Sequence, residues 1–212
     1  MRPSEPDLPL ACVLISCAER ADICRQTLAH LAVTDWRERP VHVQQDRKLT
    51  SDRLQNIVDT GYLALAYGLR TKAPWLLFLE DDLIFNNHLW QNIAAWWPLK
   101  NGHITLASLY NPGVRSVFAA PQDNFFEAHP HYTYGSQALL LTHGTIEYLV
   151  AHWDEVIAPL DIRVFRLAAR LQRPLYYHVP SLVQHVGNQS LWGGKFHGAV
   201  DFDPGWQAME HT

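Results

Sequence analysis

Apolar runs alternate with amphipathic segments along the first half of the chain. Residues 10–16 (LACVLIS) and 75–79 (WLLFL) are almost entirely apolar, as expected for strands that are covered on both faces. Between them, residues 21–31 and 50–69 carry apolar side chains at helical spacing, and residues 41–45 form a short strand candidate. The alternation predicts an α/β protein with a mostly parallel central sheet flanked by helices.

The second half continues the same alternation. Further strands are predicted at residues 103–109, 138–141 and 175–179, and further helices at residues 87–97, 142–153 and 162–171. Pro98 is expected to end the helix before it, and Thr50 or Ser51 to cap the helix that starts at residue 50. Residues 187–212 are rich in glycines and aromatic residues, so we expect a loop-rich C-terminal tail.

The composition fits one globular domain that spans residues 1–212. Hydrophobic residues make up 48% of the chain and charged residues 18%, and we find no internal repeat or low-complexity linker. The formal net charge of −4 gives no support for tight non-specific binding to nucleic acid. No stretch has the length of a membrane span.

The N-terminal region and the cysteines favour a cytoplasmic protein. Glu5 and Asp7 precede the first apolar run, which therefore reads as a core strand and not as a signal peptide. Cys12, Cys17 and Cys24 lie close together without the spacing of a metal site, so free thiols in a reducing compartment are expected.

Three consecutive carboxylates, Glu80, Asp81 and Asp82, directly follow the apolar run at residues 75–79. In parallel α/β sheets, ligands bind outside the carboxyl ends of the strands. Adjacent carboxylates repel one another, and a hard cation such as Mn²⁺ or Mg²⁺ relieves the repulsion. An acidic turn that stabilises the start of a following helix is the alternative. The position after a buried strand favours the metal site.

Other polar residues are expected at the same edge of the sheet. Residues 16–20 follow the first strand, and Asp46 follows the second. His185 lies in the apolar segment PSLVQHVG. A histidine in such a segment is often a core residue, but beside a carboxylate metal site its neutral imidazole is a second candidate ligand.

Three segments together resemble the GT-A class of nucleotide-sugar glycosyltransferases: LFLEDDL, YGSQALLL and APLDIRVFRLAARLQRPLYYHVPSLVQHVGNQS. The last is most similar to the β-1,4-N-acetylglucosaminyltransferases that branch N-glycans, which share a PSLxQHxG segment. The likeness runs in order from residue 11 to about residue 190. It implies a single GT-A-like domain with a Rossmann-type sheet.

The resemblance implies a role for each matching residue. Asp82 and His185 would bind Mn²⁺ or Mg²⁺. Asp161, in Pro159-Leu160-Asp161, would be the catalytic base of an inverting enzyme, although the start of a helix also suits an N-cap. The residues expected to bind the nucleotide sugar are Ser16, Glu19, Arg20, Asp46, Arg53, Asn56, Glu80, Asp81, Gly135, Ser136, Gln137, Asn188, Ser190, Lys195 and His197.

The resemblance therefore implies a metal-dependent inverting glycosyltransferase that moves a hexosyl or N-acetylhexosaminyl group from a UDP-sugar to an acceptor hydroxyl. A nucleotidyl- or phosphoryl-transfer enzyme would also need acidic metal ligands, but residues 16–20 lack the glycines of a phosphate-binding loop. A non-catalytic nucleotide- or carbohydrate-binding module, with tryptophans as stacking platforms, is a third possibility.

The acceptor and the oligomeric state stay open. A glycan, a protein and a modified nucleobase are all compatible with the sequence as acceptors. The short chain, without the signal anchor of the Golgi branching enzymes, suggests a bacterial or phage-type enzyme. Four arginines, Arg163, Arg166, Arg170 and Arg173, lie along one predicted helix and its end, and a solvated face is the simplest interpretation.

Overall fold

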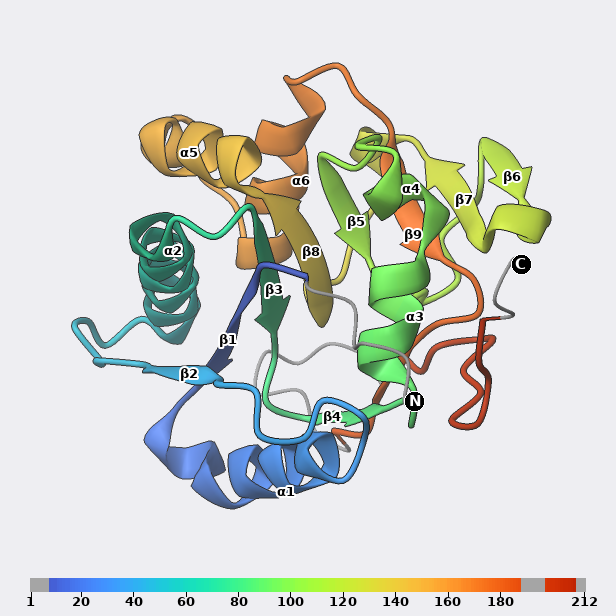
Figure 1. Cartoon of the computed structure of the whole chain (residues 1–212). Helices are drawn as coiled ribbons and strands as arrows, with labels where there is room; N and C mark the ends of the chain where they lie inside the picture. The colour runs from blue at the N-terminus through green and yellow to red at the C-terminus, as the bar shows by residue number, and fades with distance from the viewer. Residues whose placement is uncertain (1–7, 188–196, 209–212) are drawn as a thin grey trace.

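A computed structural model describes residues 8–187 and 197–208 (Figure 1). Within them, an eight-stranded sheet has the order β2-β1-β3-β8-β5-β9-β7-β6, and β10 and β4 form a separate pair. The strands are β1 (Leu10–Ser16), β2 (His42–Gln45), β3 (Trp75–Leu79), β4 (Leu83–Phe85), β5 (Leu106–Ser108), β6 (Phe118–Ala120), β7 (Phe125–Ala128), β8 (Ala138–Thr142), β9 (Leu175–His178) and β10 (Val183–His185).

Helices connect most of these strands. The α-helices are α1 (Ala21–Ala32), α2 (Arg53–Thr71), α3 (Leu89–Ala95), α4 (Trp97–Lys100), α5 (His143–Ala151) and α6 (Leu160–Ala169). The short 3₁₀ helices are η1 (Ala18–Arg20), η2 (Pro121–Asp123), η3 (Pro130–Tyr132) and η4 (Trp153–Glu155). None of the helices in the described residues is long and apolar enough to cross a membrane.

The large sheet is mostly parallel, as predicted. β1 pairs in parallel with β2 and β3, and β5 pairs in parallel with β9. β8 is antiparallel to both β3 and β5, and β7 is antiparallel to β9 and β6. Among the described strands of the large sheet, only β8 and β7 therefore run against the common direction. The chain is a single α/β domain with a central sheet flanked by helices.

Each face of the sheet is covered by its own hydrophobic core. Because side chains alternate along a strand, Leu77 and Leu79 of β3 join the core under α1 and α3. Leu76 and Phe78 point the other way, into the core under α2, α5 and α6. Figure 1 shows α2 and α5 side by side on one side of β3, with α3 on the other. The continuous apolar run therefore belongs to a strand buried on both faces.

Two predicted helices differ most from the structure, and α6 begins and ends two residues earlier than predicted. α2 begins at Arg53, and Asp52 caps it by accepting hydrogen bonds from the backbone N–H groups of Leu54 and Gln55 at 2.8 and 3.3 Å. Thr50 and Ser51, the two predicted caps, lie outside the helix. The helix expected at residues 87–97 is divided, because Trp96 has an extended backbone (φ −63°, ψ 123°). Pro98 lies in the first turn of α4, where proline is well tolerated.

The short strands β4, β6, β7 and β10 have three or four residues each and are not predicted from the sequence. β4 and β10 matter most, since their antiparallel pairing places Leu83 opposite His185. The backbone N–H of Val186 also donates to the carbonyl of Asp82 at 2.9 Å. This ribbon joins the end of the acidic motif to the distant histidine.

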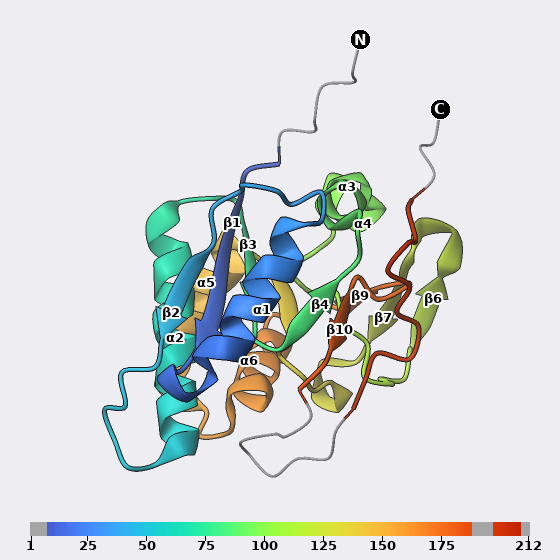
Figure 2. The same cartoon turned by 90° about the horizontal axis from the view of Figure 1, so that it is seen from below.

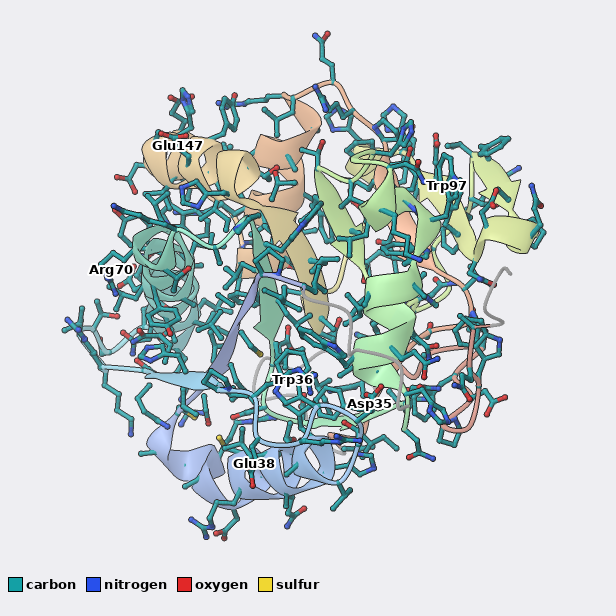
Figure 3. All side chains as sticks on the ribbon, viewed as in Figure 1. Asp35, Trp36, Glu38, Arg70, Trp97 and Glu147 are labelled. Atoms are coloured by element: carbon teal, nitrogen blue, oxygen red, sulfur yellow. The ribbon has the colours of Figure 1, made fainter. Side chains whose placement is uncertain are left out.

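The start of α3 is fixed by a neighbouring loop (Figure 3). The carboxylate of Asp35 accepts hydrogen bonds from the backbone N–H groups of Trp90 and Gln91 at 2.7 and 2.9 Å. The adjacent Trp36 is 2% exposed and meets the ring of Trp90 edge-on, with ring centroids 5.6 Å apart. The loop after α1 therefore supports the helix that follows β4.

The described part of the tail, residues 197–208, contains no helix or strand. It packs against β4 and α3 through two buried asparagines. Asn86 donates to the backbone carbonyls of Asp203 and Trp206, both at 2.8 Å, and Asn92 donates to the carbonyl of Trp206 at 3.1 Å. Cys12, Cys17 and Cys24 are free thiols, as expected.

Candidate functional site

A cavity of about 700 Å³ opens where β1 and β3 end. Figure 2 views the molecule from this side. The cavity is lined by every candidate residue in the described part of the chain: Ser16, Glu19, Arg20, Asp46, Arg53, Asn56, Glu80, Asp81, Asp82, Gly135, Ser136, Gln137, Asp161, His185 and His197. Asn188, Ser190 and Lys195 lie outside the described residues. Residues from distant parts of the sequence thus share one wall.

Arg20, the last residue of η1, contacts two carboxylates of the acidic motif. Its Nε donates to Asp81 Oδ1 at 2.7 Å, and its Nη2 donates to Asp82 Oδ2 at 2.5 Å. Burial lowers the pKa of Arg20, but the two negative charges outweigh it and the pKa is raised. Ser16 Oγ donates to Asp81 Oδ2 at 2.6 Å. Both oxygens of Asp81 therefore accept hydrogen bonds, one from the last residue of β1 and the other from η1.

The motif leads into β4 and not into a helix, so the acidic helix-start interpretation is wrong. Asp82 instead faces His185, whose Nε2 lies 3.0 Å from Asp82 Oδ2. His185 Nδ1 lies 3.1 Å from the carbonyl of His197 and donates its hydrogen there, which directs Nε2 towards Asp82. Asp82 Oδ1 is buried and has no hydrogen-bond partner in the described residues.

The pKa values of this pair reflect mutual stabilisation. Burial raises the pKa of Asp82, but the hydrogen bond and charge of His185, with the charge of Arg20, outweigh burial and lower it. Burial lowers the pKa of His185, but the hydrogen bond and charge of Asp82 outweigh burial and raise it. The opposite directions are those of a carboxylate and an imidazolium in contact.

The chemistry of these atoms fits Mn²⁺ or Mg²⁺. An octahedral ion with bonds of about 2.1 Å has neighbouring ligand atoms about 3.0 Å apart, which is the spacing of Asp82 Oδ2 and His185 Nε2. Asp82 Oδ1 is a further oxygen without a partner among the described groups. The described residues contain no preformed cluster of three or more His, Cys, Asp or Glu ligands. The 3.0 Å contact makes Asp82 and His185 a candidate pair of ligands for the ion.

Glu80 is held on the other side of the motif. Its Oε1 accepts a hydrogen bond from Ser136 Oγ at 2.6 Å, and its backbone N–H donates to the carbonyl of Gln137 at 2.9 Å. Burial, reinforced by the charge of Asp82, raises the pKa of Glu80 to about 7, although the Ser136 hydrogen bond opposes this. The acidic motif is therefore tied to the start of β8 as well as to the end of β1.

Asp161 is the second residue of α6, and Pro159 occupies the N-cap position. The N-cap interpretation is therefore wrong, although Asp161 Oδ1 accepts the free N–H of Ile162 at 2.8 Å. Asp161 Oδ2 accepts the N–H of Gly135 at 3.0 Å. Gly135 has φ +90°, which favours glycine at this turn. Two backbone donors thus fix the carboxylate on the cavity wall.

Lys48 and Thr50 are cavity residues that the sequence analysis missed. Lys48 forms an ion pair with Glu19, and the hydrogen bond from its ammonium lowers the pKa of Glu19 to about 2. The Asn56 amide donates to the carbonyl of Thr50 at 2.9 Å and accepts from its N–H at 3.0 Å. Asn56 therefore holds the loop before α2. Lys48 is close in sequence to Asp46, a candidate donor-binding residue, and this closeness could have indicated that Lys48 lines the cavity.

Tyr110 was also missed, and no sequence signal links it to the site. It follows β5, is 1% exposed, and contacts His197. Its hydroxyl lies 2.7 Å from His197 Nδ1 and donates to the carbonyl of His197 at 2.8 Å. Burial and the charge of His185 lower the pKa of His197. Tyr110 thus positions a tail residue beside the Asp82–His185 pair.

No protein-family model matches the sequence, and no curated protein is similar to it in sequence. Solved structures do share its fold. A197 from STIV matches with a TM-score of 0.52 at 13% identity, over 96% of this chain and 99% of that chain. A glycosyltransferase involved in the glycosylation of the major capsid of PBCV-1 matches with a TM-score of 0.54 at 10% identity, over 85% and 94%. The chain therefore has an α/β fold similar to that of a glycosyltransferase.

Proposed function

We propose that this protein is a metal-dependent inverting glycosyltransferase with a UDP-sugar as donor. The observation that carries the proposal is the contact between Asp82 and His185, at 3.0 Å, in a cavity that also contains Asp161. The similarity of the fold to that of a glycosyltransferase supports it. The resemblance to the N-glycan-branching family favours a hexosyl or N-acetylhexosaminyl group as the transferred sugar, and we expect a cytoplasmic enzyme.

Asp82 and His185 would hold Mn²⁺ or Mg²⁺. When bound, the ion stabilises the negative charge that develops on the departing diphosphate. Arg20 keeps Asp82 and Asp81 in place through its two hydrogen bonds. The other donor-binding roles fall to the loops after β1 and β2, to Arg53 and Asn56 of α2, and to residues 135–137. His197 would contact the donor from the tail, whereas Asn188, Ser190 and Lys195, which are also expected to bind the nucleotide sugar, lie outside the described residues.

Asp161 would act as the base. Its carboxylate accepts the proton of the acceptor hydroxyl while the hydroxyl oxygen attacks the anomeric carbon, and UDP leaves from the opposite side with the bonding electron pair. The anomeric configuration is therefore inverted. The N–H groups of Gly135 and Ile162 hold the carboxylate in place, so it needs no reorientation as the acceptor arrives.

Thermal unfolding with UDP, in the presence and absence of Mn²⁺, tests the proposal. A ligand that binds only the folded protein raises the melting temperature. We expect UDP to do so only with Mn²⁺, and we expect Asp82→Ala to remove the shift. NMR analysis of the anomeric proton in the product, once a donor is found, tests inversion.

Asp123→Ala is the control variant for Asp82→Ala in this thermal unfolding experiment. Asp123→Ala replaces an aspartate of the 3₁₀ helix η2, which does not line the cavity. This variant should keep the metal-dependent shift. If no nucleotide stabilises the wild-type protein with Mn²⁺ or Mg²⁺, the proposed function is wrong. Release of pyrophosphate from a nucleoside triphosphate would favour a nucleotidyltransferase instead.

A further inference from the structure

The C-terminal tail supplies a backbone carbonyl to the Asp82–His185 pair. The carbonyl of His197 accepts hydrogen bonds from His185 Nδ1 at 3.1 Å and from the Tyr110 hydroxyl at 2.8 Å. His197 begins the described part of the tail, and we call residues 197–201 the tail strap. The position of the tail strap therefore decides whether His185 has this acceptor for its Nδ1 hydrogen.

The tail strap is bound to β10 through Gln184, the residue before His185. Gln184 Oε1 accepts the backbone N–H of Ala199 at 2.7 Å and the backbone N–H of His185 at 3.0 Å. Gln184 Nε2 donates to the carbonyl of Ala199 at 3.3 Å. The backbone of the strap lies close to this side chain, since a Cβ atom at Gly198 would be 3.2 Å from Gln184 Oε1. One amide side chain thus holds the strap next to His185.

A second set of contacts anchors the other end of the tail strap. Asp201 Oδ1 accepts hydrogen bonds from Ser181 Oγ at 2.5 Å and from the Ser181 backbone N–H at 3.2 Å. Ser181 is fully buried, and its Oγ also accepts the N–H of Asn111 at 3.0 Å. The Ser181 hydroxyl therefore has a defined orientation, because it accepts one hydrogen bond and donates another. The Val200 N–H donates to the carbonyl of Asn111 at 3.3 Å, so the strap is held at both ends.

The acceptor at His185 Nδ1 determines which ring nitrogen can bind an ion. A neutral imidazole carries one hydrogen, on Nδ1 or on Nε2, and the other nitrogen has the lone pair that a metal ion needs. Because the His197 carbonyl can only accept, it keeps the hydrogen on Nδ1 and the lone pair on Nε2, 3.0 Å from Asp82 Oδ2. Without that carbonyl, a hydrogen on Nε2 would donate to the Asp82 carboxylate, and Nε2 could not bind the ion.

We propose that Ser181, Gln184 and Asp201 are positioning residues for the metal site, which act through the tail strap by holding the His185 ring with its hydrogen on Nδ1. This inference rests on the proposed function, since it takes His185 as a ligand of the ion. Ser181 and Gln184 belong to the PSLVQHVG segment, and neither of them lines the cavity. Their role is therefore indirect, and it makes metal binding depend on the C-terminal tail.

Two measurements on Asp201→Ala test the proposal. NMR of the histidine ring nitrogens in metal-free protein, at an alkaline pH where His185 is neutral, shows which nitrogen carries the hydrogen. The His185 signals are assigned as those absent from His185→Gln. We expect the hydrogen on Nδ1 in the wild-type protein and partly on Nε2 in Asp201→Ala. Titration calorimetry should show an Mn²⁺ affinity about ten- to hundredfold lower in Asp201→Ala, as for changes beside metal ligands.

Asp201→Asn and Asp203→Ala are the matched controls. The side-chain oxygen of the asparagine can still accept both hydrogen bonds from Ser181, although the negative charge is lost. Asp203 lies in the same tail, but its carboxylate accepts the backbone N–H of Gly205 instead. Both variants should keep the wild-type position of the hydrogen on His185 and the wild-type Mn²⁺ affinity.

Gln184→Met is the second test variant, because it removes both hydrogen bonds to Ala199 at a similar side-chain length. It should reproduce both effects of Asp201→Ala. If the hydrogen stays on Nδ1 of His185 in both variants, or if both bind Mn²⁺ as the wild-type protein does, the proposal is overturned. An equal loss of affinity in Asp201→Asn would assign the effect to charge and would also overturn it. If the wild-type protein binds neither Mn²⁺ nor Mg²⁺, the proposed function fails, while the NMR measurement still decides whether the tail strap positions His185.

Discussion

His185 Nε2 lies 3.0 Å from Asp82 Oδ2, although the two residues are 103 positions apart in the sequence. The β4–β10 ribbon brings them together, because Leu83 and His185 are paired across it. Asp82 is buried, and Arg20 contacts the same oxygen. Asp82 Oδ2 thus contacts both the guanidinium of Arg20 and the imidazole of His185. A side chain added at residue 187 would disturb both contacts.

Gly187→Ala should disrupt the pair without unfolding the protein. A Cβ atom at residue 187 would overlap Asp82 Oδ2 and lie 3.0 Å from His185 Nε2. Either side chain must then move, and we expect Mn²⁺ affinity to fall about ten- to hundredfold, as for changes beside metal ligands. Titration calorimetry with Mn²⁺ measures the affinity, and circular dichroism monitors the fold.

Gly144→Ala is the matched control for this change. Gly144 lies in the first turn of α5, and a Cβ atom there would meet nothing within 4 Å. Because alanine is a better helix former, the variant should gain up to about 1 kcal/mol in the free energy of unfolding. Its Mn²⁺ affinity should equal that of the wild-type protein. Unchanged Mn²⁺ affinity in Gly187→Ala would show that the ion does not bind between Asp82 and His185.

Asp161→Asn should separate donor binding from chemistry. The amide has nearly the same shape, and its oxygen can still accept the hydrogen bond from the Gly135 N–H. It cannot accept a proton from an attacking hydroxyl, so the rate should fall about a hundredfold or more. The release of UDP during slow donor hydrolysis, with water in place of the acceptor, measures this rate. Full activity with unchanged UDP binding would exclude Asp161 as the base.

Much of the fold could be predicted because buried strands and helices have characteristic patterns of apolar residues. β1 and β3 have the predicted bounds, since strands covered on both faces are continuous apolar runs. β4 and β10 have three residues each, too few to show a period. The acidic motif could therefore be assigned to the end of a strand, while the ribbon that joins Asp82 to His185 could not be found.

The candidate site could be predicted only in part, for a similar reason. Residues at the ends of adjacent strands meet because the sheet topology requires it, which accounts for Ser16, Asp46 and Asp82. The contact of Tyr110 with His197 depends on the path of an irregular tail, which leaves no pattern in the sequence. Arg163 makes a contact of the same kind. The sequence predicts that its side chain is exposed, but Trp153 of η4 covers it.

Tyr110→Phe should loosen His197. The lost hydroxyl lies 2.7 Å from His197 Nδ1 and donates to its carbonyl at 2.8 Å, so the free energy of unfolding should fall by about 1 kcal/mol. If His197 helps to bind the donor, the affinity for UDP with Mn²⁺ should fall about three- to tenfold. Chemical denaturation and titration calorimetry measure the two effects.

Tyr177→Phe provides the comparison for stability. The hydroxyl of Tyr177 is buried and has no hydrogen-bond partner among the described groups, so its removal should leave the free energy of unfolding unchanged or raise it. A similar loss of stability in both variants would mean that the Tyr110 hydroxyl contributes nothing specific. Unchanged UDP affinity in Tyr110→Phe would remove His197 from the donor site.

His178 should make the protein less stable in acid. Burial lowers the pKa of His178 to about 4, although the hydrogen bond to the Pro180 carbonyl opposes the decrease. The folded state therefore keeps His178 neutral while the unfolded state takes up a proton below its ordinary pKa of about 6.5. The contribution is complete above that value and is lost as the pH falls towards 4, by up to about 3 kcal/mol.

His178→Asn tests this origin of the pH dependence. The asparagine amide can still donate to the Pro180 carbonyl, which His178 Nδ1 contacts at 2.7 Å, but it does not titrate. The smaller side chain leaves space between Trp96 and Trp206, so the variant should be less stable at every pH. The informative quantity is therefore the slope of the free energy of unfolding between pH values of about 6.5 and 4.5, measured by urea denaturation. A slope equal to that of the wild-type protein would assign the acid sensitivity to other groups.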